Sequence, residues 1–442
     1  MKRILVIITA VLAVSACGFG PPSVPTGLTA SEDLHNKIEL SWTGSPNAGV
    51  YYVYRGAAAG LTGSDEEYLG STAINAYIDT TVETEVPYWY AVSAADPFGK
   101  TETALSEEVQ GIAPDLIWSL PVTVAESTTA AVLTAGGTSP IIVTATAGSP
   151  MGWYEFDEET GWTAAAESPG TATGAGIITA AIIGGALHAA FTDAASSPAG
   201  KVTVRRYSDD QWETLGTPHT PIGTAGTLSL ASSGFPTNEV YLGYLDDTDG
   251  VTVRYYPDAV NAWANLGTPD DTAPATFLMI TSGGVPYFFY EESSATLEGR
   301  VYDTDTGVWT ALPDAVESGG ITPDFMAAVT GTDSIYLAYS ASAATLSVKE
   351  YSAGAWSDLA SISSVETSGP VDLAVLNGTL YAAYVTATET VVSRYVDEEW
   401  EITAVNPGDT LAAAADLDLE THGGSLRLLT VTGGKAEVRT FE

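Results

Sequence analysis

The sequence is poor in basic residues and in cysteine. Its 442 residues include Lys+Arg 15 against Asp+Glu 55, which gives a formal net charge of −40. A nucleic-acid surface needs a footprint of Lys and Arg to displace counterions, and docking on anionic lipid needs the same charge. The composition therefore argues against both partners. The single cysteine excludes an internal disulfide framework and a cysteine-based zinc site.

Catalytic signatures are also absent. The four histidines show no H-x-x-x-H or H-E-x-x-H spacing, and the chain has no P-loop, no dinucleotide fingerprint and no G-x-S-x-G elbow. What is present is apolar: hydrophobic residues make up 45% of the chain, enough for a real core. The length suits two to four domains, or one large repeat fold with a small module.

The N-terminus has the pattern of an export signal. Lys2 and Arg3 precede an apolar stretch, residues 4–14, that is too short to span a bilayer. The small residues Val14-Ser15-Ala16 then lead directly to Cys17, the only cysteine. This arrangement resembles the lipobox of bacterial lipoproteins. The alternative is an ordinary secretory signal in which the cysteine is coincidental.

The resemblance implies that residues 1–16 form a lipoprotein signal peptide, that Cys17 carries the acyl chains (palmitate among them), and that residues 17–21 form a linker. Several acyl chains on one residue give stable anchoring, so the membrane is a partner through the lipid anchor. Gly18 follows the cysteine where an Asp would resemble a retention signal for the inner membrane. We therefore expect a bacterial outer-membrane location, with the side of the membrane left open.

Residues 22–113 carry an ordered series of strand motifs. Ile38, Leu40 and Trp42 alternate with polar residues, as a strand with one buried face does. The motifs run in the order P-x-G-L-x-A, I-x-L-S-W, Y-x-V-Y-R, Y-x-D-T-T and Y-W-Y-A-V-S-A, which resembles the fibronectin type III pattern. The resemblance implies a β-sandwich with Trp42 in its core and Tyr88 as a candidate tyrosine corner. Such a module would act as a spacer or an interaction domain.

Residues 114–442 contain an internal repeat marked by tryptophan. Seven tryptophans recur from position 118 to position 400, a mean spacing of 47 residues over six intervals: Trp118, Trp162, Trp212, Trp263, Trp309, Trp356 and Trp400. The period falls in the range of β-propeller repeats. Four short strands, a to d, fit each period, with the tryptophan opening strand d.

The two ends of this region predict closure. Trp118 begins it as a d strand without a, b or c, and the C-terminus ends with a, b and c and no d. The first strand would complete the last blade and hide the exposed strand edges. The fold class expected is therefore all-β: a fibronectin type III sandwich, then a seven-bladed β-propeller closed by pairing of its first strand with the C-terminal blade. A linear solenoid is the alternative. The region resembles the bacterial extracellular propellers, which include lectins, sialidases, lyases and scaffolds, so this resemblance assigns no function.

Acidic turns supply the candidate sites. A turn between strands b and c holds Asp246, Asp247 and Asp249, and Glu291 ends strand b of the next unit. Alternating carboxylates suit Ca²⁺, so these three aspartates are the metal candidate and calcium is the only candidate cofactor. Asp246, Asp249 and Glu291, with His219 on a d–a loop, are the candidate ligand-binding residues. Asp303–Gly307 also resembles a calcium loop, but it occupies the c–d turn that every unit needs, as Asp157–Gly161 does, so we interpret both segments as turns.

Three functions remain open at this point. The first is a non-catalytic envelope lipoprotein that binds a glycan or protein partner, because the repeats are nearly equal in length and no catalytic residue can be assigned. The second is a polysaccharide-degrading hydrolase or lyase that uses carboxylates on the a strands, with Asp372, Asp416 and Asp418 as candidates. The third is a structural subunit of an envelope assembly. Sialidase activity is not expected, because the Arg and Lys residues of the c strands repeat from unit to unit.

Overall fold

The structure is a computed structural model that divides the chain into two compact units, Met1–Leu116 and Ile117–Glu442. The boundary lies three residues beyond the one expected from sequence. The residues described are 21–441, apart from 32–36, 65, 85, 98–100, 114–116, 136, 138, 174–177, 197–199, 217–226, 235–236, 247–249, 258–259, 270–273, 275, 292–295, 314–315, 317–325, 342–344, 364, 366–368 and 406–410. The segment 1–20, with Cys17, lies outside them.

The described residues form strands and no helix. Accordingly, none of them belongs to a helix long and apolar enough to cross a membrane.

The first unit consists of two antiparallel sheets packed around one core. One sheet has the order β1-β2-β5, with strands Thr26–Ala30, Ile38–Thr43 and Ala76–Asp79. The other has the order β4-β3-β6-β7, with strands Tyr68–Thr72, Val50–Gly56, Pro87–Ala95 and Val109–Ile112. Residues alternate between buried and exposed along β2, as its sequence predicts. Trp42 is buried there and meets the Tyr51 ring edge-on at 5.3 Å.

A buried ion pair ties the two sheets of this unit together. Asp79, at the end of β5, is 1% exposed and accepts hydrogen bonds from Arg55 (2.8 Å) and from the Tyr90 hydroxyl (2.9 Å). The backbone N–H and the hydroxyl of Thr81 also donate to it, at 2.9 and 2.8 Å. The Arg55 guanidinium lies 4.6 Å from the centre of the Tyr88 ring, whose hydroxyl accepts from the Glu83 N–H. Both oxygens of this carboxylate are thus satisfied.

Within its described residues, the second unit repeats one antiparallel sheet seven times. The first strands of these sheets are β10 (Ala130–Thr134), β14 (Ile178–Ile183), β18 (Leu228–Ser232), β22 (Phe277–Ser282), β26 (Met326–Thr330), β31 (Val371–Leu376) and β36 (Asp416–His422). The second strands are β11 (Ile141–Ala145), β15 (Ala186–Asp193), β19 (Val240–Asp246), β23 (Val285–Glu291), β27 (Ser334–Ala341), β32 (Thr379–Val385) and β37 (Ser425–Thr432).

The outer half of each sheet repeats in the same way. The third strands are β12 (Gly152–Asp157), β16 (Lys201–Ser208), β20 (Gly250–Tyr256), β24 (Leu297–Asp303), β28 (Thr345–Ser352), β33 (Thr390–Val396) and β38 (Lys435–Phe441). The fourth strands of the first six sheets are β13 (Gly161–Ala164), β17 (Gln211–Thr214), β21 (Ala264–Gly267), β25 (Val308–Ala311), β29 (Ala355–Asp358) and β34 (Glu399–Ile402). The short strand β30 (Ile362–Ser363) adds to β28.

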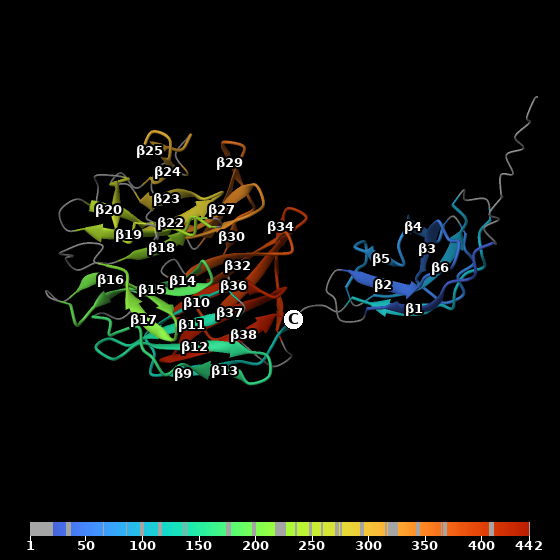
Figure 1. The fold of residues 1–442 in the computed structure, drawn as a ribbon, viewed down its shortest axis with the longest axis horizontal. Coiled ribbons are helices and arrows are strands. Elements are labelled where there is room, and N and C mark those ends of the chain that lie inside the picture. The colour runs from blue at the N-terminus through green and yellow to red at the C-terminus, as the bar shows by residue number, and fades with distance from the viewer. Residues whose placement is uncertain are drawn as a thin grey trace, which may run out of the picture. The chain divides into compact units, whose positions relative to one another are not determined.

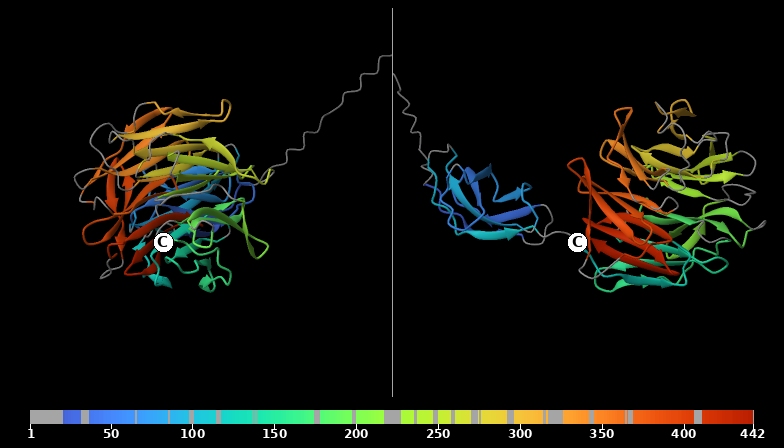
Figure 2. Two further views of the ribbon diagram at one scale, coloured as in Figure 1. Left: turned by 90° about the vertical axis from the view of Figure 1, so that its left-hand side faces the viewer. Right: turned by 180° about the vertical axis from the view of Figure 1, so that it is seen from behind.

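The seventh sheet takes its outer strands from the start of the unit. β38 pairs with β8 (Ile117–Trp118) and with β9 (Val122–Glu126), and β35 (Ala404–Val405) lies parallel to β8. Trp118 is fully buried, stacks on Phe441 at 5.0 Å and donates its indole N–H to Thr403 at 2.8 Å. In Figures 1 and 2 the red C-terminal strands accordingly lie beside the blue-green strands that begin the unit.

The first strands contact one another in sequence order, and β36 also contacts β10. Two of these strands carry alanine pairs, Ala180–Ala181 of β14 and Ala327–Ala328 of β26. Ala412–Ala415 precede β36, which begins at Asp416.

Candidate functional site

The residues predicted from sequence as ligand-binding or metal-binding lie mostly in loops. His219, Asp247 and Asp249 are outside the described residues. Asp246 ends β19, where its backbone pairs with Gly250. Glu291 ends β23 opposite Leu297, and its N–H donates to the Thr276 carbonyl at 3.3 Å. Among the residues that are described, no three Asp, Glu, His or Cys side chains group so as to hold a metal ion. The calcium site therefore stays a prediction.

The segments Asp157–Gly161 and Asp303–Gly307 are turns, as we interpret them from the sequence. The Asp157 carboxylate accepts from the N–H groups of Glu159 and Thr160, at 3.0 and 2.9 Å. Asp303 does the same with Asp305 and Thr306, at 2.9 and 3.1 Å. These hydrogen bonds lower the pKa of both aspartates. Each carboxylate thus stabilises its own hairpin.

The acidic residues of the first strands all come from two neighbouring strands, within the parts of the chain that the structure describes. Asp372 lies on β31, and Asp416, Asp418 and Glu420 occupy alternate positions of β36. Because alternate residues share one face of a strand, the three β36 carboxyls project from the same face. With Thr330 and Val375, among other residues, Asp372, Asp418 and Glu420 line a cavity of about 330 Å³.

These carboxyls hold adjacent first strands together. Asp372 accepts from the Leu419 N–H of β36 at 2.7 Å. Asp418 accepts from the Leu133 N–H of β10 at 2.8 Å, and Asp416 accepts from the Ala131 N–H at 3.3 Å. We define Asp372, Asp416 and Asp418 as the seam carboxyls, because they link β31, β36 and β10, where the beginning and end of the unit meet.

No cation is among the groups that shift the pKa values of these acids, so burial governs their protonation. Burial raises the pKa of Asp418 well above its usual range, and the nearby Asp372 charge raises it further. Burial also raises the pKa of Asp372, while a hydrogen bond from Asp418 partly opposes this effect. The pKa of Asp416 is raised to about 6 and that of Glu420 to about 8, in both cases first by burial. A hydrogen bond joins Asp418 to Asp372, and the pKa is raised more strongly at Asp418.

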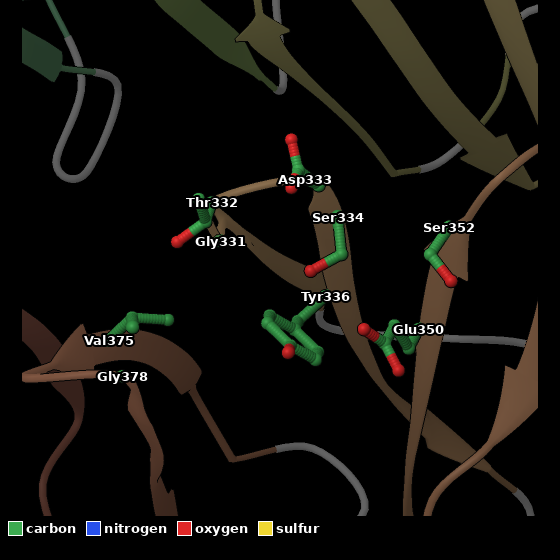
Figure 3. Close-up of a pocket in the computed structure, with 9 residues that line it drawn as sticks. All are labelled: Gly331, Thr332, Asp333, Ser334, Tyr336, Glu350, Ser352, Val375 and Gly378. Atoms are coloured by element: carbon green, nitrogen blue, oxygen red, sulfur yellow. The ribbon is translucent and has the colours of Figure 1, made fainter.

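A second cavity, of about 270 Å³, opens between the fifth and sixth sheets (Figure 3). Tyr336 of β27 and Glu350 of β28 are opposite each other in the strand register, so their side chains are neighbours. Ser334 and Ser352 add hydroxyl groups. The β26–β27 turn, Gly331–Asp333, and the β31–β32 turn, with Val375 and Gly378, form the rest of the wall. We call this the Glu350 pocket.

The Glu350 pocket combines an aromatic face with hydrogen-bonding groups. A carboxylate accepts hydrogen bonds from ligand hydroxyls, serine hydroxyls donate and accept, and a tyrosine ring packs against the C–H face of a sugar. The backbone keeps the space open at Gly331, where a Cβ would lie 2.7 Å from the Ser334 oxygen and 3.0 Å from the Tyr336 ring. The arrangement can hold a small polyhydroxylated ligand.

The sequence does not predict the Glu350 pocket. Its wall comes from two sheets, and Tyr336 and Val375 lie 39 positions apart in the chain. One signal was available: Glu350 directly precedes the aromatic residue that pairs with the repeat tryptophan Trp356, and most units carry another residue type at that position.

A scan against protein-family models finds no match, and a search of curated proteins finds none either. Among solved structures, the chain is similar to the SapL1 lectin in complex with alpha methyl fucoside, at 12% identity and a TM-score of 0.47, over 65% of this chain and 99% of that one. It is similar to a six-bladed β-propeller lectin of Aleuria aurantia with fucose recognition, at 12% identity and a TM-score of 0.45, over 65% and 98%. An Fn3-like protein of Clostridium thermocellum matches 22% of this chain and 96% of its own, at 32% identity and a TM-score of 0.18.

Proposed function

We propose that the chain is a non-catalytic envelope lipoprotein whose second unit binds a glycan. The observation that carries the glycan proposal is the Glu350 pocket, where the carboxylates of Glu350 and Asp333, three hydroxyl side chains and the Tyr336 ring line one cavity. The seam carboxyls, which the hydrolase or lyase hypothesis needs as catalysts, accept backbone hydrogen bonds between strands. Their geometry favours a bracing role.

We propose further that the second unit is a seven-bladed β-propeller closed by its own N-terminal strand. Seven repeated sheets and the pairing of Trp118 with Phe441 support this architecture. We also propose that the first unit is a fibronectin type III sandwich that acts as a spacer. The seven-strand order of its two sheets, and the buried Trp42 between them, support that assignment.

The membrane anchor rests on the sequence at Cys17. Acylation there would tether the protein to the bacterial outer membrane, with the two units outside the bilayer. Metabolic labelling with an alkyne palmitate tests this directly: the wild-type chain should take up the label, and a Cys17→Ser chain should not. An assembly role remains the other candidate, and a single-size monomer after mild detergent extraction would argue against it.

A glycan array tests the binding function. The full chain, extracted in detergent, should bind neutral glycans, and Glu350→Gln should weaken the binding about tenfold or more, because a charged hydrogen-bond acceptor contributes about 1.5–3 kcal/mol. Tyr336→Ala should weaken it as well. Glu158→Gln, in the exposed β12–β13 turn, is the matched control and should bind as wild type does. An empty array for the wild-type chain would refute the proposal.

A further inference from the structure

The repeat allows the position of Glu350 to be compared across all seven sheets. Each third strand carries an aromatic residue next to the repeat tryptophan of the fourth strand, as at Tyr207–Trp212 and Tyr351–Trp356. We define the residue before this aromatic as the pre-aromatic position. In sheet order its occupants are Glu155, Arg206, Tyr255, Val301, Glu350, Arg394 and Thr440. Two of the seven are carboxylates.

The two arginines at this position are engaged within their own sheets. Arg206 pairs with Glu213 at 2.5 Å, and Arg394 pairs with Glu401 at 3.1 Å. Neither the Glu155 carboxylate nor the Glu350 carboxylate forms a hydrogen bond or ion pair with another residue in the described part of the chain. Both carboxylates therefore keep their full capacity to accept hydrogen bonds from a ligand.

A cavity of about 180 Å³ surrounds Glu155 in the same way that the Glu350 pocket surrounds Glu350. It opens between the first and second sheets. The two cavities use matched positions: Ser139, Ile141, Glu155, Ile182 and Gly185 in one, and Ser334, Tyr336, Glu350, Val375 and Gly378 in the other. The strand register fixes the match, since Ile141 faces Glu155 as Tyr336 faces Glu350, and Ile182 faces Leu187 as Val375 faces Leu380.

Both cavities have an aromatic surface, but residues at different positions supply it. Ile141 stands where the Glu350 pocket has Tyr336. In its place Trp153 and Tyr207 line the Glu155 cavity, with ring centres 4.8 Å apart. The Trp153 indole N–H donates to the Glu167 carbonyl at 2.7 Å, which fixes the ring in place. A rigid aromatic face beside a carboxylate and a serine recurs, although the residues that supply it differ.

From these matched positions we infer that the Glu155 cavity is a second glycan site, so that one chain is divalent. The inference rests on the proposed function of the Glu350 pocket and extends it. Both sites place a carboxylate with no cationic partner against the ligand, on a chain whose formal net charge is −40. Anionic sugars such as sialic and uronic acids would be repelled, so the ligand class is a neutral sugar with adjacent hydroxyls.

The two sites are separated around the unit. One lies between the first and second sheets and the other between the fifth and sixth. The third and fourth sheets stand entirely between them in one direction, and the seventh sheet in the other. Each site therefore engages its own sugar, and the chain would cross-link a polysaccharide or hold it by avidity rather than clamp one residue.

Native mass spectrometry of the full chain, released from detergent, counts the sites. The probes are the methyl glycosides of glucose, galactose, mannose, fucose and N-acetylglucosamine, with methyl glucuronide and methyl sialoside as anionic counterparts. We expect occupancy by two copies of at least one neutral probe and by none of the anionic ones. Glu155→Gln and Glu350→Gln should each reduce the occupancy to one, the double variant should bind none, and Glu158→Gln should retain two.

The outcomes separate this inference from the function on which it rests. A single bound probe that is lost in Glu350→Gln and retained in Glu155→Gln would overturn the second site and leave the Glu350 pocket standing. Two bound copies that both survive in the double variant would overturn both assignments. Failure of every neutral probe to bind the wild-type chain would overturn the proposed function together with the second site. Equal binding of the anionic probes would refute the ligand class.

Discussion

The first unit buries Asp79, the second half-buries Asp418 beside a cavity, and the two units handle the charge in opposite ways. Asp79 in the first unit accepts hydrogen bonds from Arg55, Thr81 and Tyr90. Burial alone would raise its pKa, but these bonds outweigh burial and the pKa is lowered. Asp418 in the second unit has the Leu133 N–H and the Asp372 carboxyl as neighbours, and burial raises its pKa. The pKa of a carboxyl is thus lowered where a cation and several donors surround it, and raised where a second acid is its neighbour.

The largest effect should follow from neutralising the aspartate that needs its charge. Asp79→Asn leaves the half-buried Arg55 without its partner and removes an acceptor from the buried Tyr90 hydroxyl. We expect the first unit to lose about 3–5 kcal/mol of stability, the range seen when one partner of a buried ion pair is removed. Hydrogen exchange of the β5 and β6 amides in the full chain measures this loss. Glu66→Gln, at an exposed position, is the control, and unchanged protection in Asp79→Asn would contradict the ionic role.

The pH dependence should differ between the units. The pKa values of the seam carboxyls and Glu420 are raised in the folded chain, so the folded state keeps protons that the unfolded state has already released. Their stabilisation is complete below about pH 4 and is lost as the pH rises through the folded values, about 6 for Asp416 and about 8 for Glu420. For Asp416 alone the shift corresponds to about 3 kcal/mol.

Asp79 has the opposite sign. Its lowered pKa contributes stability that is complete above the unfolded value near 4 and disappears only in stronger acid. Between pH 5 and pH 8 we therefore expect the second unit to lose protection against hydrogen exchange, after correction for the intrinsic rate, while the β5 and β6 amides keep theirs. A parallel loss in both units would remove the contrast.

The contrast also shows what the sequence could predict. Six of the seven repeat tryptophans located the fourth strands because each packs on an aromatic residue five to seven positions before it, as Trp212 does on Tyr207 at 5.4 Å. That is a local relation, whereas Trp118 packs on the distant Phe441. Strand β31, Val371–Leu376, is likewise ended locally, by a two-residue turn at Asn377-Gly378 in which both residues have positive φ.

The sites depended on relations that the sequence does not display. Asp372 and Asp418 could be named as acids of the first strands, but the hydrogen bond between them requires the register of β31 against β36, 46 positions apart. The Leu133 N–H that Asp418 accepts lies 285 positions away. The candidates Asp246 and Glu291 rest on turn composition alone, whereas the Glu350 pocket forms where two sheets meet. Local patterns thus predicted elements, whereas the candidate sites depend on non-local register.

The smallest effect should come from Asp418, whose pKa is raised in the folded chain. In Asp418→Asn the side-chain oxygen can still accept from the Leu133 N–H, and the amide can donate to Asp372 as the protonated acid does. At pH 5 we expect the variant to match the wild-type chain within about 1 kcal/mol, because no charge or hydrogen bond is lost. At pH 8 it should be the more stable of the two, since the wild-type chain has then lost stability that the raised pKa of Asp418 contributes only at lower pH. Hydrogen exchange of the β10 and β36 amides measures both values. If Asp418→Asn were as strongly destabilised as Asp79→Asn, Asp418 would be ionised in the folded chain. The two units would then handle their aspartates in the same way.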